Sequence, residues 1–282
     1  KPVINLIVNR LKEAGVTYTS RMISNGYLLD AETVKQAHDE WKLNHVQITI
    51  DGTEQTYNRV KAYIYRGVNA YERVMENIGH LLAADIAVSI RMNIDMHNAD
   101  DLERLAEELH ERFKDQKHLS AYLHLLFEDN AKRVGACDDD KRKVLMEKMR
   151  LIEDKLEGWG LFRHHNFEPI IKTGYCMTDN DGSVVIQPDG YITKCEHYTD
   201  SQHVGHISQD GQDAEKIAWF KEKGTMVGEF CKQCVKYPDC QFLLNCPNFG
   251  ECYPEMPQLY EHQLREEMKA MYKAYLEKGT EG

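Results

Sequence analysis

The chain has 282 residues, of which 42% are apolar, so it can bury a sizeable core in one large domain or two ordinary ones. Its 46 acidic and 35 basic residues leave a net charge of −11, which argues against proteins that bind nucleic acid or a membrane surface through a basic face. No stretch reaches the roughly 18 apolar residues of a membrane span, and no signal-peptide pattern is present. We therefore expect neither nucleic acid nor a membrane as a partner.

The first 130 residues alternate between the periodicities of helices and strands. Helices are predicted at 2–13, 31–43, 71–84 and from Asn98 onwards, with Asp30 and Asn98 as caps. Strands are predicted at 22–30, where the chain turns out into a loop at Asn25-Gly26, and at 45–52, 87–95 and 121–128. This alternation is typical of βαβ units and therefore predicts a parallel sheet covered by helices.

The strand AVSIRMNID, residues 87–95, has an apolar face and a face of Ser89, Arg91, Asn93 and Asp95. Parallel strands are usually apolar on both faces because other elements cover both. Two interpretations remain: an edge strand with one face in water, or a strand whose polar face lines a barrel or cleft for a polar ligand. The predicted strands are too few to close a barrel, so we expect further strands upstream of Lys1.

The second half of the chain begins with a charged connector and then changes character. DDDKRKVLMEKMRLIEDKLEGW, residues 138–159, is predicted as an amphipathic helix with an acidic start. A hairpin is predicted from strands 183–187 and 191–195 joined by Pro188-Asp189-Gly190. A short strand at 205–207, a helix at about 213–222 and a C-terminal amphipathic helix at 257–278 complete the predicted elements.

Cysteines are unevenly distributed along the chain. Residues 1–136 contain none, and seven of the eight follow residue 175. This distribution, without a signal sequence, favours a reducing compartment, so we expect a cytoplasmic protein whose clustered cysteines are metal ligands more often than disulfides. Cys137 has no neighbour at ligand spacing and is interpreted as an incidental thiol.

The remaining seven cysteines leave three chemistries open. Cys231 and Cys234 have the CxxC spacing with which two thiolates bind one metal centre. Zinc would use four cysteines and leave three, which a histidine such as His197 or His203 could complete. Disulfides would pair six and leave one. Iron–sulfur ligation accounts for all seven, with one cluster on four thiolates and another on three.

The order of these cysteines resembles the SPASM domain, a C-terminal extension of many radical S-adenosylmethionine (AdoMet) enzymes. The matching elements are Cys176, the GxxxxC of Gly190 and Cys195, CxxCxxxxxC at 231–240, Cys246 and Cys252, over residues 170–260. The resemblance implies two auxiliary [4Fe–4S] clusters: an outer one on Cys231, Cys234, Cys240 and Cys252, and an inner one on Cys176, Cys195 and Cys246. One departure is the five-residue spacer QFLLN before Cys246, where the family usually has three residues and a Gly-Gly pair.

The N-terminal half resembles the same enzymes. SNGYLL, VQITIDG and IRMNID are similar to the third, fourth and fifth strands of a partial radical SAM (β/α)6 barrel. The resemblance implies that AdoMet is contacted by Ser24, Asn25, Thr49, Arg91 and Asn93. We thus expect an α/β fold with a partial barrel at 1–135, a helical connector at 136–168, a small α+β SPASM domain at 169–262 and a C-terminal helix at 263–282.

The family's cluster motif, CxxxCxxC, and its glycine-rich motif are not found in this sequence. Both precede the strands recognised here, so we expect them upstream of Lys1. Without them the chain should not cleave AdoMet by itself. This expectation makes the sequence a fragment of a longer enzyme.

The resemblance implies a radical SAM oxidoreductase-type maturase, which abstracts hydrogen from a peptide or protein substrate to form thioether or carbon–carbon crosslinks. A flavodoxin or ferredoxin would donate electrons. Formylglycine formation in a sulfatase is the alternative; in those maturases an aspartate that serves as base follows the GxxxxC cysteine, and here Glu196 holds that position. A zinc-binding structural or interaction module remains as an alternative of another class.

Overall fold

The computed structural model describes residues 2–62, 66–125, 139–161, 176–198, 200–222, 228–235 and 244–246, with single residues and pairs between 257 and 276. The chain divides into two compact units, Lys1–His165 (unit 1) and Asn166–Gly282 (unit 2), which are described separately. Within the described residues, no helix combines the length and the apolar character needed to cross a membrane.

Unit 1 alternates helices and strands in the predicted order. Its elements are α1 (Pro2–Glu13), β1 (Ser20–Ser24), α2 (Ala31–Asp39), β2 (Leu43–Thr49), α3 (Glu54–Lys61), α4 (Ala70–Ala83), β3 (Ala87–Ile94), α5 (Ala99–Phe113), β4 (Leu119–Leu125) and α6 (Asp139–Gly158). The strand predicted at 22–30 ends at Ser24, because the chain turns at Asn25 and Gly26. Helix α3 was not predicted, since its sequence EQTYNRVK is almost wholly polar and buries only Tyr57.

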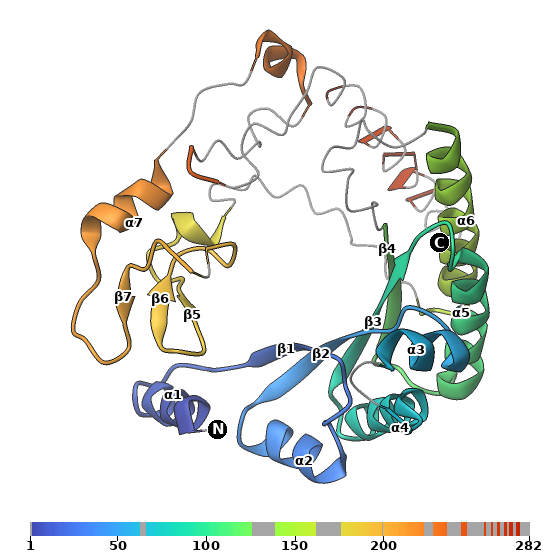
Figure 1. Cartoon of the computed structure of the whole chain (residues 1–282), viewed down its shortest axis with the longest axis horizontal. Helices are drawn as coiled ribbons and strands as arrows, with labels where there is room; N and C mark the ends of the chain where they lie inside the picture. Colours follow the sequence, from blue (N-terminus) through green and yellow to red (C-terminus); the bar gives the residue numbers. More distant parts are fainter. Residues whose placement is uncertain are drawn as a thin grey trace. The chain divides into compact units, whose positions relative to one another are not determined.

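The four strands form one parallel sheet in the order β1-β2-β3-β4. Helices α2, α4 and α5 cover the same side of this sheet (Figure 1). The fold-class prediction of an α/β chain with part of a (β/α)6 barrel is confirmed. Strand β3 pairs with β2 on one side and β4 on the other, so the interpretation of AVSIRMNID as an edge strand is wrong.

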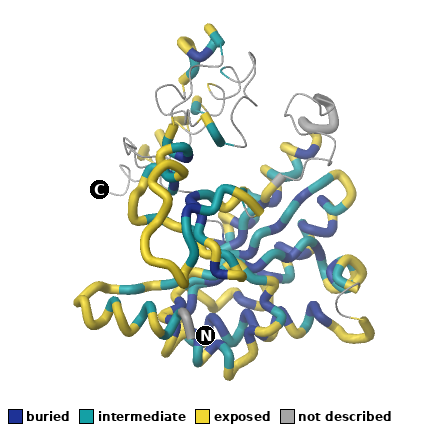
Figure 2. The backbone as a smooth tube through the Cα atoms, turned by 60° about the vertical axis from the view of Figure 1, so that its left-hand side comes forward, coloured by how far each residue is buried: buried dark blue, intermediate teal, exposed yellow. Residues whose placement is uncertain are grey.

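The core of unit 1 lies between the sheet and its helices. Val46, Ile48, Val88, Ile90 and Met92 alternate along β2 and β3 and are completely buried. Figure 2 shows this alternation of buried and partly buried residues along the strands. Each such side chain stabilises the fold by about 1.5–3 kcal/mol relative to exposure in water. This burial fixes which side of each strand faces the helices.

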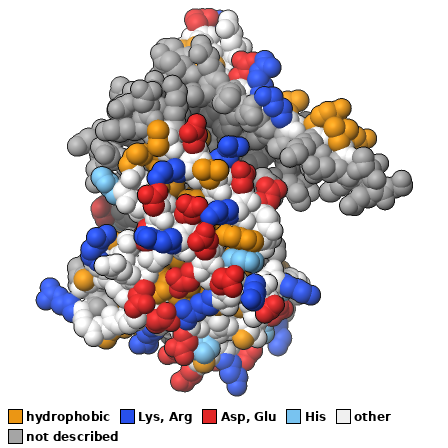
Figure 3. All heavy atoms as spheres, turned by 90° about the vertical axis from the view of Figure 1, so that its right-hand side faces the viewer, with side chains coloured by type: hydrophobic (Ala, Val, Ile, Leu, Met, Phe, Trp, Pro, Cys, Tyr) orange, Lys and Arg blue, Asp and Glu red, His pale blue; other side chains and the backbone are white. Residues whose placement is uncertain are grey.

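Ion pairs join the helices on the outside of unit 1. Lys155 of α6 binds Glu103 and Glu107 of α5 at 2.7 Å each, and Lys148 pairs with Asp100. Acidic and basic side chains are interspersed on the face that Figure 3 shows, without a broad field of one sign. The helices are therefore held by charge pairing as well as by apolar contact.

Unit 2 contains short elements. They are η2 (Met177–Asp179), β5 (Val185–Ile186), β6 (Tyr191–Thr193), β7 (Gly205–His206), α7 (Ala214–Lys221) and η3 (Glu229–Gln233). The predicted hairpin, third strand and helix are confirmed, with an antiparallel order β5-β6-β7. Gly190, the glycine of the GxxxxC motif, has φ +92°, and a Cβ there would lie 2.8 Å from Nε2 of His206. The C-terminal helix predicted at 257–278 lies largely outside the described residues.

Candidate functional site

One side of the unit 1 sheet carries polar side chains, which we call the polar sheet face. Its members alternate with the buried core residues along three strands: His45, Gln47 and Thr49 on β2, Ser89, Arg91 and Asn93 on β3, and Ser120, Tyr122 and His124 on β4. All except His124 are partly buried. Alternation along the strands therefore places a polar surface opposite the helix-covered core.

Three predicted cofactor contacts meet at the carboxyl end of this face. Thr49 and Arg91 are paired across β2 and β3. Nε of Arg91 donates to Oδ1 of Asn93 at 2.9 Å, which orients the guanidinium. Burial, followed by the charge of Arg91, lowers the pKa of His124. Arg91 therefore stands as an oriented positive charge suited to a carboxylate.

Hydrogen bonds fix the chain where β2 and β3 end. The backbone N–H of Asn93 donates to Oδ1 of Asp51 at 3.2 Å. Asn98 donates through Nδ2 to the carbonyls of Asn93 (2.8 Å) and Asp51 (3.2 Å). Asn98 is the N-cap of α5, as predicted, but its side chain makes no capping hydrogen bond to that helix. It joins the two strand ends instead and supports the site.

The polar sheet face also contains residues that were not predicted as site residues. The hydroxyl of Tyr122 donates to Oε1 of Gln47 at 2.8 Å. Nε2 of His45 lies 2.9 Å from Oγ of Ser89, and that oxygen lies 2.9 Å from Oγ of Ser120. Burial, followed by the charge of Arg21, lowers the pKa of His45. The alternation in HVQIT and AYLHL was the signal that could have identified these residues.

Two predicted contacts, Ser24 and Asn25, lie apart from this group. Ser24 is opposite Ile48 in the register, on the side of the sheet that helices cover, and its Oγ accepts from the N–H of Gly26 at 3.1 Å. Asn25 is exposed, and its Oδ1 accepts from the N–H of Tyr27 at 3.2 Å. Both side chains thus shape the turn after β1, and their role as cofactor contacts stays a prediction.

Helix α4 holds this turn in place. Asn77, whose side chain is buried, donates through Nδ2 to the carbonyls of Gly26 (2.8 Å) and Tyr27 (3.1 Å). Arg73 donates to the same Tyr27 carbonyl at 3.0 Å and lies 4.4 Å from the centre of the Tyr27 ring. Gly26 has φ +76°, and a Cβ there would lie 3.1 Å from Ile48. Side chains of α4 therefore hold the turn at the carboxyl end of β1.

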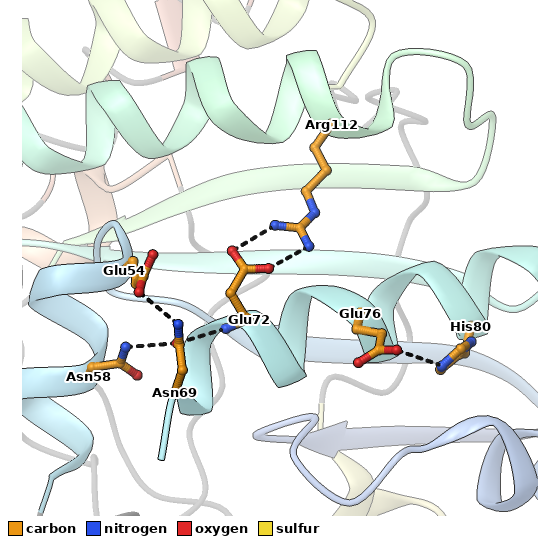
Figure 4. Close-up of polar contacts among 7 residues, drawn as sticks. All are labelled: Glu54, Asn58, Asn69, Glu72, Glu76, His80 and Arg112. Carbon is orange, nitrogen blue, oxygen red and sulfur yellow. Dashed lines mark hydrogen bonds and ion pairs between the residues drawn. The ribbon is translucent and has the colours of Figure 1, made fainter. Parts of the chain in front are cut away.

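A hollow of about 810 Å³ lies on the helix side, lined by residues of α2, α4 and α5. Two pairs of its charged side chains bind one another, as Figure 4 shows: Arg112 donates through both terminal nitrogens to Glu72, and Glu76 lies 4.0 Å from His80. Arg73 donates to the carbonyl of Tyr27, and Asp30 accepts from the N–H of Thr33. Since these side chains are already bound within the protein, the hollow is a weaker candidate for a charged ligand than the polar sheet face.

Three predicted ligands of the inner cluster come together in unit 2. Cys195 follows β6, Cys176 precedes η2, and Cys246 ends a described segment of three residues. Burial raises the pKa of the Cys195 thiol, and the nearby thiols of Cys176 and Cys246 raise it further. The hairpin thus returns Cys195 toward Cys176, as the sequence predicted, and the segment at 244–246 adds a third thiol.

Lys194 stabilises the turn between Cys176 and the hairpin. Its side chain is 1% exposed, and Nζ donates to the carbonyls of Asn180 at 2.7 Å and Ser183 at 2.5 Å. Burial lowers the pKa of this lysine. On the other side of the same turn, Asp181 pairs with Lys221. The chain around Cys176 and Cys195 is therefore held by polar bonds more than by apolar contact.

The remaining thiols are placed in part. Cys231 lies in η3, and the backbone N–H of Cys234 donates to its carbonyl at 3.1 Å, which keeps the CxxC pair in one tight turn. The five described cysteines are free thiols: Cys176, Cys195, Cys231, Cys234 and Cys246. The predictions for Cys240 and Cys252 lie outside the described residues, as does Cys137.

The donor set fits iron–sulfur clusters in its chemistry. Among the residues that the structure describes, no three His, Cys, Asp or Glu side chains are arranged to hold a single metal ion. In a cluster each thiolate binds its own iron, so the thiolates lie farther apart than the ligands of one ion. Cys176, Cys195 and Cys246 are free thiols of the type that such a cluster uses, and they would hold the inner cluster.

The candidate base and the candidate zinc ligands lie near the same hairpin. Glu196 is exposed, and its charge contributes to the raised pKa of Cys195. His197 is exposed as well, whereas the ring of His203 stacks on Tyr191 with 4.3 Å between the ring centres. The role of Glu196 as a base stays a prediction.

Comparison with solved structures identifies the fold. The chain is similar to native anSMEcpe, an anaerobic sulfatase-maturating enzyme of the radical SAM class, with bound AdoMet and the Kp18Cys peptide: the TM-score is 0.51 and the identity 16%, over 91% of this chain and 80% of that one. The complex of anSMEcpe with AdoMet and the Cp18Cys peptide has a TM-score of 0.51 and an identity of 15%, over 91% of this chain and 81% of that one. The complex of anSMEcpe with AdoMet has a TM-score of 0.52 and an identity of 13%, over 91% of this chain and 78% of that one. No known protein family and no curated protein matches the sequence. The chain thus has the fold of a radical SAM enzyme.

Proposed function

We propose that this chain is part of a radical SAM enzyme that modifies a peptide or protein. The observation that carries the proposal is the polar sheet face, because it occurs in a chain with the fold of an enzyme that has been solved with bound AdoMet. Thr49, Arg91 and Asn93 come together at its carboxyl end, which is where parallel α/β proteins bind their ligands.

In this proposal the polar sheet face binds AdoMet. Arg91 binds the carboxylate of the methionine moiety in a fixed orientation, because its guanidinium is already oriented by Asn93. Thr49 and Asn93 hydrogen-bond the polar parts of the cofactor. When bound beside a reducing cluster, AdoMet supplies an organic radical that takes a hydrogen atom from the substrate.

Unit 2 would hold two auxiliary clusters. Cys176, Cys195 and Cys246 hold the inner one, and Cys231 and Cys234 hold the outer one together with Cys240 and Cys252. The free thiols and the proximity of the first three support this assignment. We propose that Glu196, beside Cys195 in the chain, accepts a proton from the substrate.

The finer proposal is that the product is a thioether or carbon–carbon crosslink in a peptide. Formylglycine formation is the competing chemistry, since the similar structures contain Kp18Cys and Cp18Cys peptides. Glu196 stands where the sulfatase-maturating enzymes have an aspartate, and its carboxylate could accept a proton in either reaction. We further propose a cytoplasmic location and electron supply from a flavodoxin or ferredoxin.

The decisive experiment is anaerobic reconstitution of this chain, followed by measurement of iron, acid-labile sulfide and zinc on one sample. About eight irons per chain with broad absorption near 400 nm would support two clusters. Equilibrium binding of AdoMet to the reconstituted chain then tests the polar sheet face. Zinc without iron would contradict the proposal and favour a structural metal module.

The reaction is tested with a polypeptide that also carries a CxxxCxxC motif, by mass spectrometry of candidate peptides. A loss of two hydrogens with linked fragments indicates a crosslink. Conversion of cysteine or serine to an aldehyde indicates formylglycine. Cleavage of AdoMet without a change in any peptide would contradict the proposed substrate class.

A further inference from the structure

Cys246 belongs to a segment that is docked onto α7. The backbone N–H of Leu244 donates to the carbonyl of Glu222 at 2.8 Å, and Nδ2 of Asn245 donates to the carbonyl of Trp219 at 2.8 Å. Nδ2 of Asn245 also lies 3.2 Å from Oε2 of Glu222. Three hydrogen bonds thus fix the two residues before Cys246 to the C-terminal end of this helix.

Tyr198 connects this segment to the turn that carries Cys195. Its hydroxyl donates to the carbonyl of Asn245 at 2.6 Å, and its backbone N–H donates to the carbonyl of Cys195 at 3.3 Å. Tyr198 therefore makes one bond to the residue before Cys246 and one bond to Cys195 itself. The thiols of Cys195 and Cys246 both act on its pKa, which is raised mainly by burial.

The ring of Tyr198 has little freedom to move. It packs edge-on against Trp219 and Phe220, with ring centres 5.6 and 5.5 Å away. The side chain of Gln187 donates to the carbonyl of Tyr198 at 3.0 Å and so fixes the backbone as well. A hydroxyl held in this way can set the position of the carbonyl it binds.

The sequence around Cys246 explains why such a support is needed. The spacer QFLLN is longer than the spacer of the SPASM pattern, and the usual Gly-Gly pair is absent. A longer spacer leaves more conformations open to the thiol, and ordering them costs free energy. Leu244 and Asn245, the last two residues of the spacer, are bound by α7 and Tyr198, and these contacts reduce that freedom.

We propose that Tyr198 is the positioning residue that sets Cys246 beside Cys195, through the bond from its hydroxyl to the Asn245 carbonyl. Asn245 assists by holding the same segment on α7. This inference rests on the proposed function in one respect, the inner cluster that the two thiols would share. The arrangement of the thiols themselves can be tested without iron.

The first test uses the iron-free chain and a short bismaleimide that links neighbouring thiols. Peptide mapping measures how fast Cys195 and Cys246 become linked in the wild type, in Tyr198→Phe and in Tyr191→Phe. Tyr191 is a matched control on the same hairpin, because it is exposed and packs on His203. We expect Tyr198→Phe to slow this linkage about 3- to 10-fold, the range that one lost hydrogen bond covers. Equal rates in all three proteins would overturn the proposal.

The second test measures iron release to a chelator from the reconstituted chain. We expect Tyr198→Phe to release about half of the iron 3- to 10-fold faster and to change the electron paramagnetic resonance signal of one cluster. In a Cys246→Ser background the same change should have no further effect, because its target is already lost. An equal effect in that background would mean that Tyr198 only stabilises unit 2, and would overturn the proposal.

The two tests separate the inference from the proposed function. A wild-type chain that binds no iron contradicts the function, while slower thiol linkage in Tyr198→Phe still supports the positioning role. A wild-type chain that binds eight irons, with a Tyr198→Phe variant that behaves identically in both tests, contradicts the positioning role alone.

Discussion

The two units of the chain are stabilised in different ways. Unit 1 buries continuous rows of apolar side chains between its sheet and helices, with Ile48, Ile90 and Met92 fully buried. Among the described residues of unit 2, the buried apolar side chains are those of Val204, Phe220 and Cys231, and the buried polar ones are those of Thr178, Thr193 and Lys194. Unit 1 can thus fold by apolar burial, whereas the described part of unit 2 buries few apolar side chains and relies more on polar bonds.

This difference separates the two tasks that the proposed function requires. A parallel sheet with a packed core offers a rigid polar face for a small cofactor. A region with short strands and clustered thiols gains stability from bound metal, because binding free energy counts as folding free energy. The following predictions test this contrast, beginning with the largest effect.

Removing iron should affect unit 2 strongly and unit 1 little. We expect the loss of about 4 kcal/mol or more from unit 2, the value for a ligand present at a thousand times its dissociation constant. Hydrogen exchange of the reconstituted and the iron-free chain measures both units in one experiment. Equal loss of protection in the two units would contradict the contrast.

Shortening a core side chain of unit 1 should destabilise unit 1 strongly and unit 2 little. Ile90→Ala should lower the free energy of unfolding of unit 1 by about 2–5 kcal/mol, because it leaves a cavity under the sheet. Ile23→Ala is the control, since Ile23 is 78% exposed, and should change stability by less than about 0.5 kcal/mol. Urea unfolding measures both, and the iron content should stay unchanged in each variant.

Replacing Arg91 should weaken cofactor binding without unfolding the sheet. Arg91→Lys loses the planar fork, so AdoMet affinity should fall by about 1.5–3 kcal/mol, or roughly 10- to 100-fold. Arg104→Lys serves as the control, because Arg104 lies on α5 and pairs with Asp101 at 2.9 Å. Calorimetric titration of the reconstituted chain decides, and equal affinities would exclude Arg91 from the site.

Asn77 should affect the turn after β1. Asn77→Ala leaves the carbonyls of Gly26 and Tyr27 without their buried donor, at a cost of about 1–3 kcal/mol in unfolding free energy. Asn44→Ala is the matched control, because Asn44 is exposed on β2. If thermal unfolding is the same for both variants, Arg73 alone holds the turn.

The smallest effect concerns the ion pair of Glu72 and Arg112. The hydrogen bonds from Arg112 lower the pKa of Glu72, so the pair stabilises the fold above the unfolded pKa near 4.5 and loses this contribution as the pH falls through the lower folded pKa. Both side chains are partly exposed, 47% for Glu72 and 33% for Arg112, so we expect at most about 0.5 kcal/mol. Thermal unfolding of Glu72→Gln should differ from the wild type at pH 7 and converge with it near pH 3. Glu111→Gln, with a carboxylate 72% exposed, should differ less at pH 7.

The sequence predicted those parts that follow from local periodicity. The alternation in VQIT and in AVSIRMNI was enough to predict the parallel strands, whereas Thr49, Arg91 and Asn93 were selected by the resemblance to radical SAM barrels, which also selected Ser24 and Asn25. The loop predicted at Asn25-Gly26 is where β1 ends, and Leu28 and Leu29 follow the turn although they were included in the predicted segment 22–30.

The remaining features depend on contacts between distant residues. Tyr122 binds Gln47 across 75 positions, and Tyr198 binds the residue before Cys246 across 47. Asparagine is a common helix-capping residue, but the side chain of Asn98 joins two strand ends instead. Periodicity and spacing do not predict such hydrogen bonds, because they describe neighbouring residues and do not indicate which distant residues the fold brings together.

Lys194 has a consequence for the handling of this protein. The turn it stabilises contains Asp179-Asn180-Asp181-Gly182, a run of oxygen-bearing side chains of the kind that binds calcium in other proteins. Here an ammonium group already occupies the centre of the turn and is bound by backbone carbonyls. We therefore expect the turn to hold its shape without dissolved calcium, so that calcium-selective chelators during purification should not loosen the backbone next to Cys176.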